Sequence, residues 1–306
     1  MELSRAQQSV IDLLGRGADP VPLPDGLIDE LETELVDGLA DIAVDLDPAD
    51  PLFVSKHALS SVHSCEAHYV VGDGEFEWSV PAVRGTVAHR AIEVMIHYRG
   101  DPHPGDLVDE SIARIVDEDF GAGRFVGGLR EFDLAELRSF AVDKVAAFQE
   151  TFPPLKAAWS PRTESRSRVE LFDGRIVLSG KTDLTLGRPP RKVIIDLKSG
   201  RASQTHREDL RFYALLEALK LRQAPRKLAS YYLDEARTHP EDVTEGVLRA
   251  AALRTVDGVR KIAELTRLGR EPRQRPGPQC RWCPLQTTCE SARLSTSRDD
   301  ADVLDL

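Results

Sequence analysis

The sequence predicts an α/β fold in which helices flank a central mixed sheet. Apolar residues recur at helical spacing in the first half of the chain, alternate with a period of two over residues 168–197, and then return to helical spacing. This order of helices, three meandering strands, a helix, one more strand and a last helix favours a mixed sheet. A chain of 306 residues that is 41% hydrophobic can bury the core that such a sheet needs.

The first 50 residues are strongly acidic. They hold 13 acidic residues against Arg5 and Arg16, which accounts for the whole net charge of −11, and the remaining residues are balanced at 38 basic and 38 acidic. Within this segment, residues 27–46 carry Leu, Ile and Val at helical spacing with acids between them. We therefore expect residues 1–50 to form an acidic helical extension, which the prolines at 48 and 51 separate from the rest.

Two further helices are predicted before the strands begin. Residues 84–99 have the pattern of a buried amphipathic helix with a glycine near its start. Residues 133–152 form the second pattern, and Pro153 and Pro154 end it.

The predicted sheet begins with a hairpin. Residues 168–186 alternate apolar and polar side chains around Asp173-Gly174, which is a strong hairpin-turn signal. Residues 192–197 form the next strand and 227–235 a later one, with helices predicted at 208–220 and 244–268. We expect one domain over residues 51–295, followed by an acidic, disordered tail at 296–306.

Positive charge is concentrated in two stretches despite the acidic total. Residues 187–227 hold 11 basic and four acidic residues, and residues 259–281 hold seven basic and two acidic residues. Such stretches can form a surface that attracts phosphates, the alternative being a mixed solvated surface. The sequence contains neither a signal-peptide pattern at its start nor an apolar run of membrane-spanning length, and it lacks a Gly-rich phosphate loop. We expect a cytoplasmic protein without an ATPase motor.

The most informative residues lie at the ends of two predicted strands. Asp196 and Lys198 are two residues apart, so their side chains share one face of a strand, and Asp183 precedes Asp196 by 13 residues on the neighbouring strand. Two carboxylates that meet at a sheet edge suit Mg²⁺ or Mn²⁺, and a lysine beside them can orient water and stabilise charge on an attacked phosphate. The alternative for Asp196 and Lys198 is an ion pair at a strand end.

The segments "SGKTD" and "VIIDLKSG" resemble the PD-(D/E)XK nuclease superfamily, and more narrowly its RecB-like branch. That branch has a G-x-x-x-H motif in an upstream helix, and this chain has Gly85 and His89 at that spacing. The branch also has Q-x-x-x-Y in the helix after D-x-K. Here Tyr213 matches, but Asp209 stands where glutamine is expected.

The resemblance implies a restriction-endonuclease-like fold and a metal-dependent deoxyribonuclease. It implies that Mg²⁺ or Mn²⁺ is held by His89, Asp183, Asp196 and the Leu197 carbonyl, that Lys198 positions the attacking water, and that Tyr213 supports the phosphate or the lysine. Glu164 is favoured over Glu170 as the glutamate that precedes the hairpin in this branch. We expect Arg201, Arg207 and Arg211 to contact the substrate, which is DNA that is single-stranded or has free ends, with a helicase or another repair or defence subunit as a partner.

Four cysteines form a separate pattern. Cys280, Cys283 and Cys289 have the spacing C-x2-C-x5-C, and Cys65 lies far upstream. Clustered cysteines in a cytoplasmic protein usually bind metal, and a structural Zn²⁺ site is one interpretation. The arrangement also resembles the iron–sulfur subset of the same nuclease branch, which implies a [4Fe–4S] cluster that fastens the C-terminal segment to the N-terminal helical region.

The sequence therefore predicts a nuclease, most simply an exonuclease, that hydrolyses phosphodiester bonds in DNA repair, recombination or defence. Two alternatives stay open: a catalytically silent nucleic-acid-binding or scaffold protein of the same fold, and an RNA-directed nuclease.

Overall fold

The computed structural model describes residues 2–72, 77–98, 100–118, 120–200 and 203–293. Arg201 and the predicted tail at 296–306 lie outside these ranges. Across the described ranges, every helix is too short or too polar to traverse a lipid bilayer.

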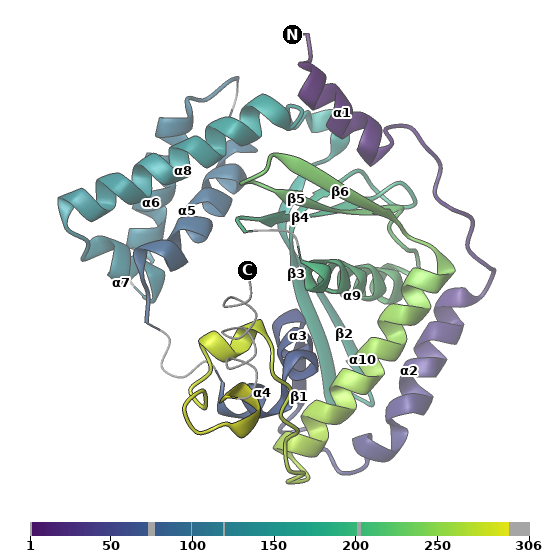
Figure 1. The fold of residues 1–306 in the computed structure, drawn as a ribbon. Coiled ribbons are helices and arrows are strands. Elements are labelled where there is room, and N and C mark those ends of the chain that lie inside the picture. The colour runs from purple at the N-terminus through teal and green to yellow at the C-terminus, as the bar shows by residue number, and fades with distance from the viewer. Residues whose placement is uncertain (1, 73–76, 99, 119, 201–202, 294–306) are drawn as a thin grey trace, which may run out of the picture.

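The described residues form one mixed sheet of six strands flanked by helices, which confirms the predicted fold class (Figure 1). The strands are β1 (Leu52–Ser55), β2 (Arg162–Leu171), β3 (Ile176–Leu186), β4 (Val193–Lys198), β5 (Lys227–Tyr232) and β6 (Arg237–Asp242). The predicted hairpin is β2–β3, and three residues of its turn, Phe172, Asp173 and Gly174, have positive φ. Glycine adopts this conformation without strain, which explains its place in the turn.

The central strand β3 has an unusual neighbourhood. Strand β2 pairs with it antiparallel from Ile176 to Thr185, with an interruption at Asp183, so β1 and β4 share its other edge. Strand β1 runs parallel to residues 176–179 of β3, and β4 runs antiparallel to residues 184–186. Residues 180–183 of β3 therefore lie between the two partners. Strand β5 is parallel to β4, and β6 closes the sheet antiparallel to β5.

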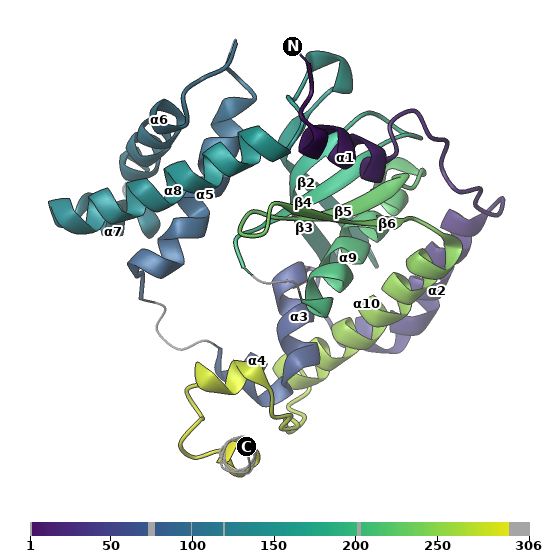
Figure 2. The same cartoon turned by 45° about the horizontal axis from the view of Figure 1, so that its top comes forward.

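Helices cover both faces of the sheet. Figure 2 shows the sheet close to edge-on, with α1 on one side and α9 on the other. The helices are α1 (Arg5–Leu14), α2 (Leu27–Ala43), α3 (Lys56–Ser64), α4 (Glu66–Val71), α5 (Val80–Met95), α6 (Pro104–Asp117), α7 (Ala122–Gly127), α8 (Glu131–Thr151), α9 (Gln204–Leu221) and α10 (Glu245–Thr266), with short 3-10 turns η1 (Ala157–Trp159) and η2 (Pro278–Arg281).

Strand β4 lies between two hydrophobic cores. Ile194 packs into the core formed with α2, α9 and α10, whereas Ile195 packs into the core formed with α1, α5 and α8. A strand that is buried on both faces needs a continuous apolar run, which "VII" supplies. A third core joins α5, α6 and α8 on the far side of the molecule.

The predicted acidic helix is present as α2, but it packs into the main core. Its leucines at positions 27, 31, 35 and 39 are at most 1% exposed, and it lies beside α10 (Figure 1). Its acids face the arginines of α10: Glu30 lies 2.5 Å from Arg249, and Asp41 lies 2.7 Å from Arg260. The helix is thus an integral part of the fold, with its leucines inward and its carboxylates on the surface.

Candidate active site

Asp183 and Asp196 face each other where β3 and β4 separate. The last pair of the ladder on this side is Leu184 with Ile195, so the two aspartates occupy the next position in register. The backbone N–H of Leu197 donates to Asp183 Oδ2 at 2.8 Å, which ties the carboxylate of one strand to the end of the other. Asp196 is almost fully buried, at 1% exposure. The two predicted carboxylates therefore share one site.

Helix α5 brings His89 to the same place. His89 Nδ1 lies 3.9 Å from Asp183 Oδ2, and the neighbouring Ala88 and Ile92 pack against the sheet. Gly85 lies one turn earlier, where a Cβ atom would be 2.7 Å from Ser199 Oγ. A side chain here would require Ser199 to rotate away, so glycine lets α5 approach the end of β4 without displacing it.

Lys198 lies beside the carboxylate that precedes it by two residues. Its Nζ is 2.6 Å from Asp196 Oδ2, but the approach angle does not make a hydrogen bond, so among the described residues this buried oxygen has no hydrogen-bond partner. The pair alone resembles a strand-end ion pair. Its burial beside Asp183 distinguishes it from an ordinary surface pair.

A second lysine, Lys56, enters the site, and sequence reasoning missed it. It begins α3 immediately after β1, with Ser55 capping the helix by accepting a hydrogen bond from Ala58 N at 3.2 Å. Its Nζ lies 3.6 Å from Asp196 Oδ1 and 3.9 Å from Asp209 Oδ2. Burial alone would lower the pKa of Lys56, but Asp196, Asp209 and Asp183 outweigh burial and raise it. Lys56 therefore stays protonated, and the carboxylates of Asp196 and Asp209 hold its ammonium in place.

Helix α9 supplies Asp209 and Tyr213. Tyr213 is 4% exposed and packs against Gly180 of β3, where a Cβ atom would be 2.6 Å from its ring. Lys56 Nζ lies 5.3 Å from the centre of the same ring, within the range of a cation–π contact. Burial, followed by the nearby aspartates, raises the pKa of Tyr213, so its hydroxyl stays protonated. Asp209, in the place of the expected glutamine, faces a lysine.

The site concentrates negative charge. Burial raises the pKa of Asp183, and the neighbouring Asp196 raises it further, whereas His89, the Leu197 N–H and Lys56 oppose this rise. Burial also raises the pKa of Asp209, against the effect of Lys56. A divalent cation would relieve the repulsion between the carboxylates. Within the described ranges, however, no three His, Cys, Asp or Glu side chains are grouped closely enough to hold a metal ion.

The glutamate that was predicted to precede the hairpin lies on β2. Its neighbours Thr163 and Ser165 pair with Leu184 and Thr182, which places Glu164 beside Asp183, but its carboxylate pairs with Lys181. The other candidate, Glu170, pairs with Arg168 near the hairpin turn. In the described part of the chain, both carboxylates are thus engaged by basic side chains and not by the site.

The predicted substrate-binding arginines have different settings. Arg211 is engaged by Glu241 at 2.5 Å and by Glu208 at 3.1 Å, so its guanidinium is already neutralised. Arg207 is exposed and lines a cavity of about 330 Å³ together with Ser230 and Tyr232. Because Tyr232 is the register partner of Lys198, this cavity adjoins the end of β4.

The segment that leads to the C-terminal cysteines packs against the segment around Cys65. Cys65 is buried between α3 and α4, and the backbone N–H of Arg275 donates to its sulfur at 3.4 Å. Nearby, Arg273 N donates to Glu66 Oε2 at 2.9 Å. Cys280 is also buried and accepts a hydrogen bond from Gly277 N at 3.4 Å. All four cysteines are free thiols, and no three of them are grouped closely enough in the described ranges to hold a metal ion. The C-terminal segment lies against the α3–α4 junction, and the cluster itself stays a prediction.

Comparison with known proteins identifies the family. Residues 54–290 match the PD-(D/E)XK nuclease superfamily. Among solved structures, a "Putative exonuclease" from Eubacterium rectale has 12% identity and a TM-score of 0.47, with 79% of this chain and 87% of that chain covered. The structure of SSO0001 has 16% identity and a TM-score of 0.31, with 69% and 97% covered. No curated protein matches the chain. The family match spans most of the chain and contains the site at β3, β4, α5 and α9: this protein belongs to the PD-(D/E)XK nuclease superfamily.

Proposed function

We propose that this protein is a metal-dependent DNA nuclease of the RecB-like branch. The observation that supports the proposal is the convergence of Asp183, Asp196, Lys198 and His89 where β3 and β4 separate. A lapsed site has no physical need to bury two carboxylates together, because each raises the cost of ionising the other. Retaining both is consistent with a cation that offsets this cost during the reaction.

The donor chemistry fits Mg²⁺ or Mn²⁺. The carboxylates of Asp183 and Asp196, the His89 imidazole and the Leu197 carbonyl would hold the ion, and the buried Asp196 Oδ2, which now lies 2.6 Å from the Lys198 ammonium, would be one of its acceptors. When bound, the ion supplies charge that polarises the scissile phosphate and lowers the pKa of water. Among the described residues, these ligand atoms do not surround a single point. To bind the ion, Asp183 Oδ2 would therefore have to give up its hydrogen bond from Leu197 N or keep it while also contacting the ion.

The remaining residues would bind and orient the reactants. Lys198 would hold the attacking water and stabilise negative charge as the new P–O bond forms and the old one breaks. Lys56, fixed by Asp196 and Asp209, would place a second positive charge beside the phosphate. Tyr213 keeps its proton and can donate to a phosphate oxygen or support Lys198. Glu164 would enter the site only by leaving Lys181.

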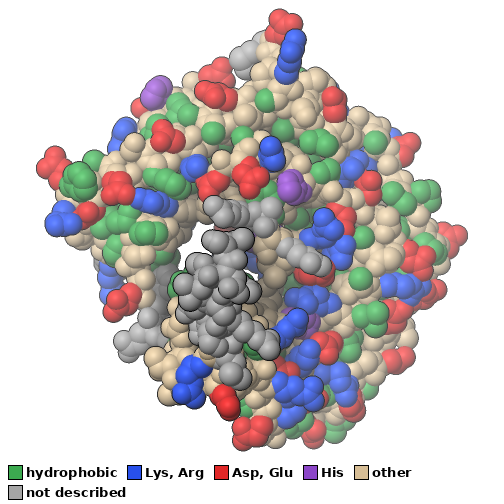
Figure 3. All heavy atoms as spheres, in the orientation of Figure 1, with side chains coloured by type: hydrophobic (Ala, Val, Ile, Leu, Met, Phe, Trp, Pro, Cys, Tyr) green, Lys and Arg blue, Asp and Glu red, His purple; other side chains and the backbone are tan. Residues whose placement is uncertain are grey.

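The surface offers limited positive charge for a DNA backbone. Figure 3 shows Lys and Arg side chains gathered on the face that carries α10, interleaved with acids. Arg260 and Arg267 already pair with Asp41 and Asp50, so the basic stretch at 259–281 is partly neutralised. Arg207 is the better candidate for a phosphate contact, because it is exposed in the cavity that adjoins β4. This placement favours a strand end that reaches the site locally over a duplex that lies along a broad basic surface.

The four cysteines are proposed to hold a [4Fe–4S] cluster, with Zn²⁺ as the alternative. Support comes from the packing of the C-terminal segment on Cys65 and from the N–H groups of Arg275 and Gly277, which point at two of the sulfurs. Hydrogen bonds of this kind stabilise thiolates in such sites. The cluster would be structural, remote from the carboxylates. The absorption spectrum of anaerobically purified protein tests it: a shoulder near ~400 nm supports iron–sulfur, and a colourless zinc-loaded protein contradicts it.

The nuclease proposal is tested by digestion of end-labelled single-stranded DNA with Mn²⁺ or EDTA. Wild-type protein and the control Lys220→Ala, which alters a lysine at the far end of α9, should cleave with Mn²⁺ alone. Asp196→Ala and Lys198→Ala should lose cleavage by at least about 100-fold while keeping the cluster spectrum. Cleavage by Lys198→Ala at the wild-type rate would refute the assignment. Binding of DNA without cleavage would favour the catalytically silent scaffold, an alternative that Asp209 in the expected glutamine position also favours. Digestion of RNA of the same sequence tests the RNA-directed alternative.

A further inference from the structure

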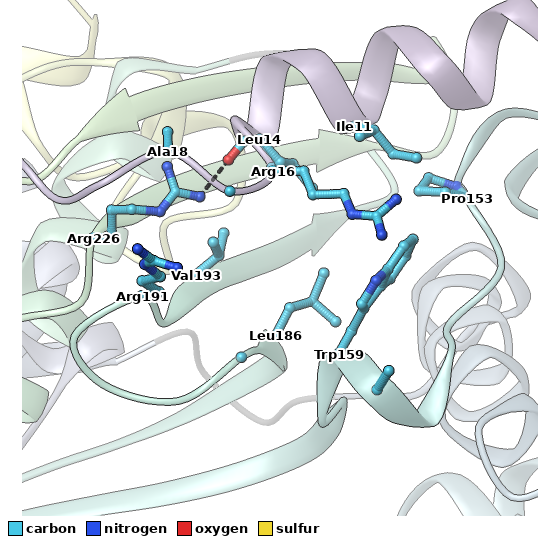
Figure 4. Close-up of a pocket in the computed structure, with 13 residues that line it drawn as sticks. Ile11, Leu14, Arg16, Ala18, Pro153, Trp159, Leu186, Arg191, Val193 and Arg226 are labelled. Carbon is cyan, nitrogen blue, oxygen red and sulfur yellow. Dashed lines mark hydrogen bonds between the residues drawn. The ribbon is translucent and has the colours of Figure 1, made fainter.

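A second cavity lies at the other end of β4 from the carboxylates. It has a volume of about 290 Å³ and is formed where α1 crosses the start of β4 (Figure 4). Its wall is largely apolar, with Ile11 and Leu14 from α1, Leu186 and Val193 from the sheet, and the indole of Trp159. Val193 and Asp196 are three residues apart on one strand, so the cavity is about 10 Å from the proposed catalytic carboxylates. It is therefore separate from the site described above.

Three arginines from separate segments line this cavity. Arg16 follows α1 and lies over the Trp159 ring at 5.7 Å, Arg191 belongs to the turn between β3 and β4, and Arg226 precedes β5. Figure 4 shows the side chains of Arg191 and Arg226 on one side of the cavity and Trp159 with Arg16 on the other. Arg226 is 6% exposed, and its Nη2 donates to the Leu14 carbonyl at 2.5 Å. Its guanidinium is thus held in place by the backbone of α1.

The positive charge around the cavity is only partly offset. Its lining contains no Asp or Glu within the part of the chain that the structure describes. Two carboxylates act on this charge: Asp19, which pairs with Arg191 at 2.6 Å and is 80% exposed, and Asp242, which pairs with Lys227 at 2.5 Å. Burial lowers the pKa of Arg226, Asp242 opposes this, and Arg191 lowers it further, so the two guanidiniums on this side of the cavity repel each other.

An anion suits this arrangement. Arg226 is buried and Arg191 is exposed beside it, so a bound phosphate would accept paired hydrogen bonds from both guanidiniums and offset their mutual repulsion. The apolar wall and the indole suit a flat ring attached to that anion. A volume of about 290 Å³ is near the lower limit of small-molecule pockets, which begin at about 300 Å³, and it excludes a nucleic-acid strand.

We propose that this cavity binds a nucleoside monophosphate, with its phosphate between Arg191 and Arg226 and its base against Trp159. Nucleoside monophosphates are the end products of an exonuclease, and this biological link to the ligand rests on the proposed function. The binding itself is independent of cleavage. The distance from the catalytic carboxylates makes the cavity a regulatory or product-sensing site.

Fluorescence of Trp159 tests the proposal directly. The chain has three tryptophans, so Trp78→Phe and Trp282→Phe leave Trp159 as the sole indole. The protein is titrated in EDTA, where the proposed cleavage does not occur, with dAMP, deoxyadenosine and inorganic phosphate in parallel. We expect a saturable change with dAMP at a one-to-one stoichiometry, and at least tenfold weaker binding of deoxyadenosine and of phosphate, because each supplies only half of the contacts.

Two variants separate the cavity from other phosphate contacts. Arg191→Gln should weaken dAMP binding at least tenfold without changing the urea midpoint, because Arg191 is largely exposed. The control Arg188→Gln alters an arginine of the same turn that does not line the cavity and should bind as wild type. Unsaturable titration of the wild type, or equal binding by Arg191→Gln, would overturn the proposal. Lys198→Ala should bind dAMP as the wild type does, because Lys198 lies outside the cavity. If the wild-type protein binds dAMP but does not cleave DNA with Mn²⁺, the proposed function is refuted and this site stands.

Discussion

Removing the charge of Lys56 should weaken the fold by an amount that depends on divalent metal. The Lys56 ammonium lies 3.6 Å from Asp196 and 3.9 Å from Asp209, and the side chain is 27% exposed. Lys56→Met keeps the length and the apolar stem of the side chain but leaves both carboxylates without this cation. The burial that opposes ionisation of Asp209 and Asp183 would then act with less compensation.

The size of the effect follows from these distances. At an effective dielectric constant of about 20, a pair of unit charges about 4 Å apart attracts by about 4 kcal/mol. The cost of removing the ammonium from water offsets much of this, so we expect a net loss of about 2–3 kcal/mol in the free energy of unfolding in EDTA. In Mn²⁺ the loss should be smaller, because a cation at Asp183 and Asp196 replaces part of the missing charge.

Urea unfolding of four proteins measures this coupling. Wild type, Lys56→Met, Asp209→Asn and the double variant form a cycle whose interaction free energy should be about 1–2 kcal/mol. Lys261→Met is the matched control, because Lys261 pairs with Asp257 on the surface of α10 and should contribute less than about 1 kcal/mol. An additive cycle, or an equal loss in EDTA and in Mn²⁺, would show that Lys56 does not stabilise the carboxylate cluster.

Three further results are expected. Burial raises the pKa of Asp183, so its charged form lowers the stability of the fold above its unfolded pKa of about 4. Asp183→Asn should therefore raise the urea midpoint at pH 7 in EDTA while abolishing cleavage, and a lower midpoint would contradict this. Leu35→Ala should cost about 2–5 kcal/mol of unfolding free energy because Leu35 is fully buried, whereas a loss below 1 kcal/mol would place α2 outside the core. Burial, with Arg254 and Lys261, lowers the pKa of His63 to about 4, so stability should fall as pH decreases from about 6.5 to 4, and a His63 NMR titration near 6.5 would disprove it.

The sequence predicted the residues of the site that lie on strongly patterned elements. Asp183, Asp196 and Lys198 occupy strands whose period of two is clear, and Gly85 with His89 occupy one face of a long helix. The convergence of Asp183 and Asp196 follows from the antiparallel register of β3 and β4, which the short connection between Leu186 and Val193 fixes locally.

Lys56 and the partners of Arg211 were beyond sequence reasoning for a different reason. Strand β1 has four residues and an exposed Phe53, and β6 carries Pro240 and several charges, so neither shows the alternation of a buried strand. Lys56 reaches the site only because β1 pairs with β3. Arg211 gains its partner Glu241, in addition to Glu208 on its own helix, because β6 lies beside α9. Such contacts depend on long-range pairing that local patterns do not encode.

The position of α2 has a practical consequence for work on the isolated domain. The family match begins at residue 54, so a protein trimmed to the matched segment would lack this helix. Each of its four buried leucines contributes about 1.5–3 kcal/mol, and their sum rivals the whole stability of a typical domain. Trimming would expose an apolar surface on α10. It would also remove the carboxylates that pair with the α10 arginines, which would then bind nucleic acid non-specifically. The segment that matches the family is therefore shorter than the segment that packs as one domain.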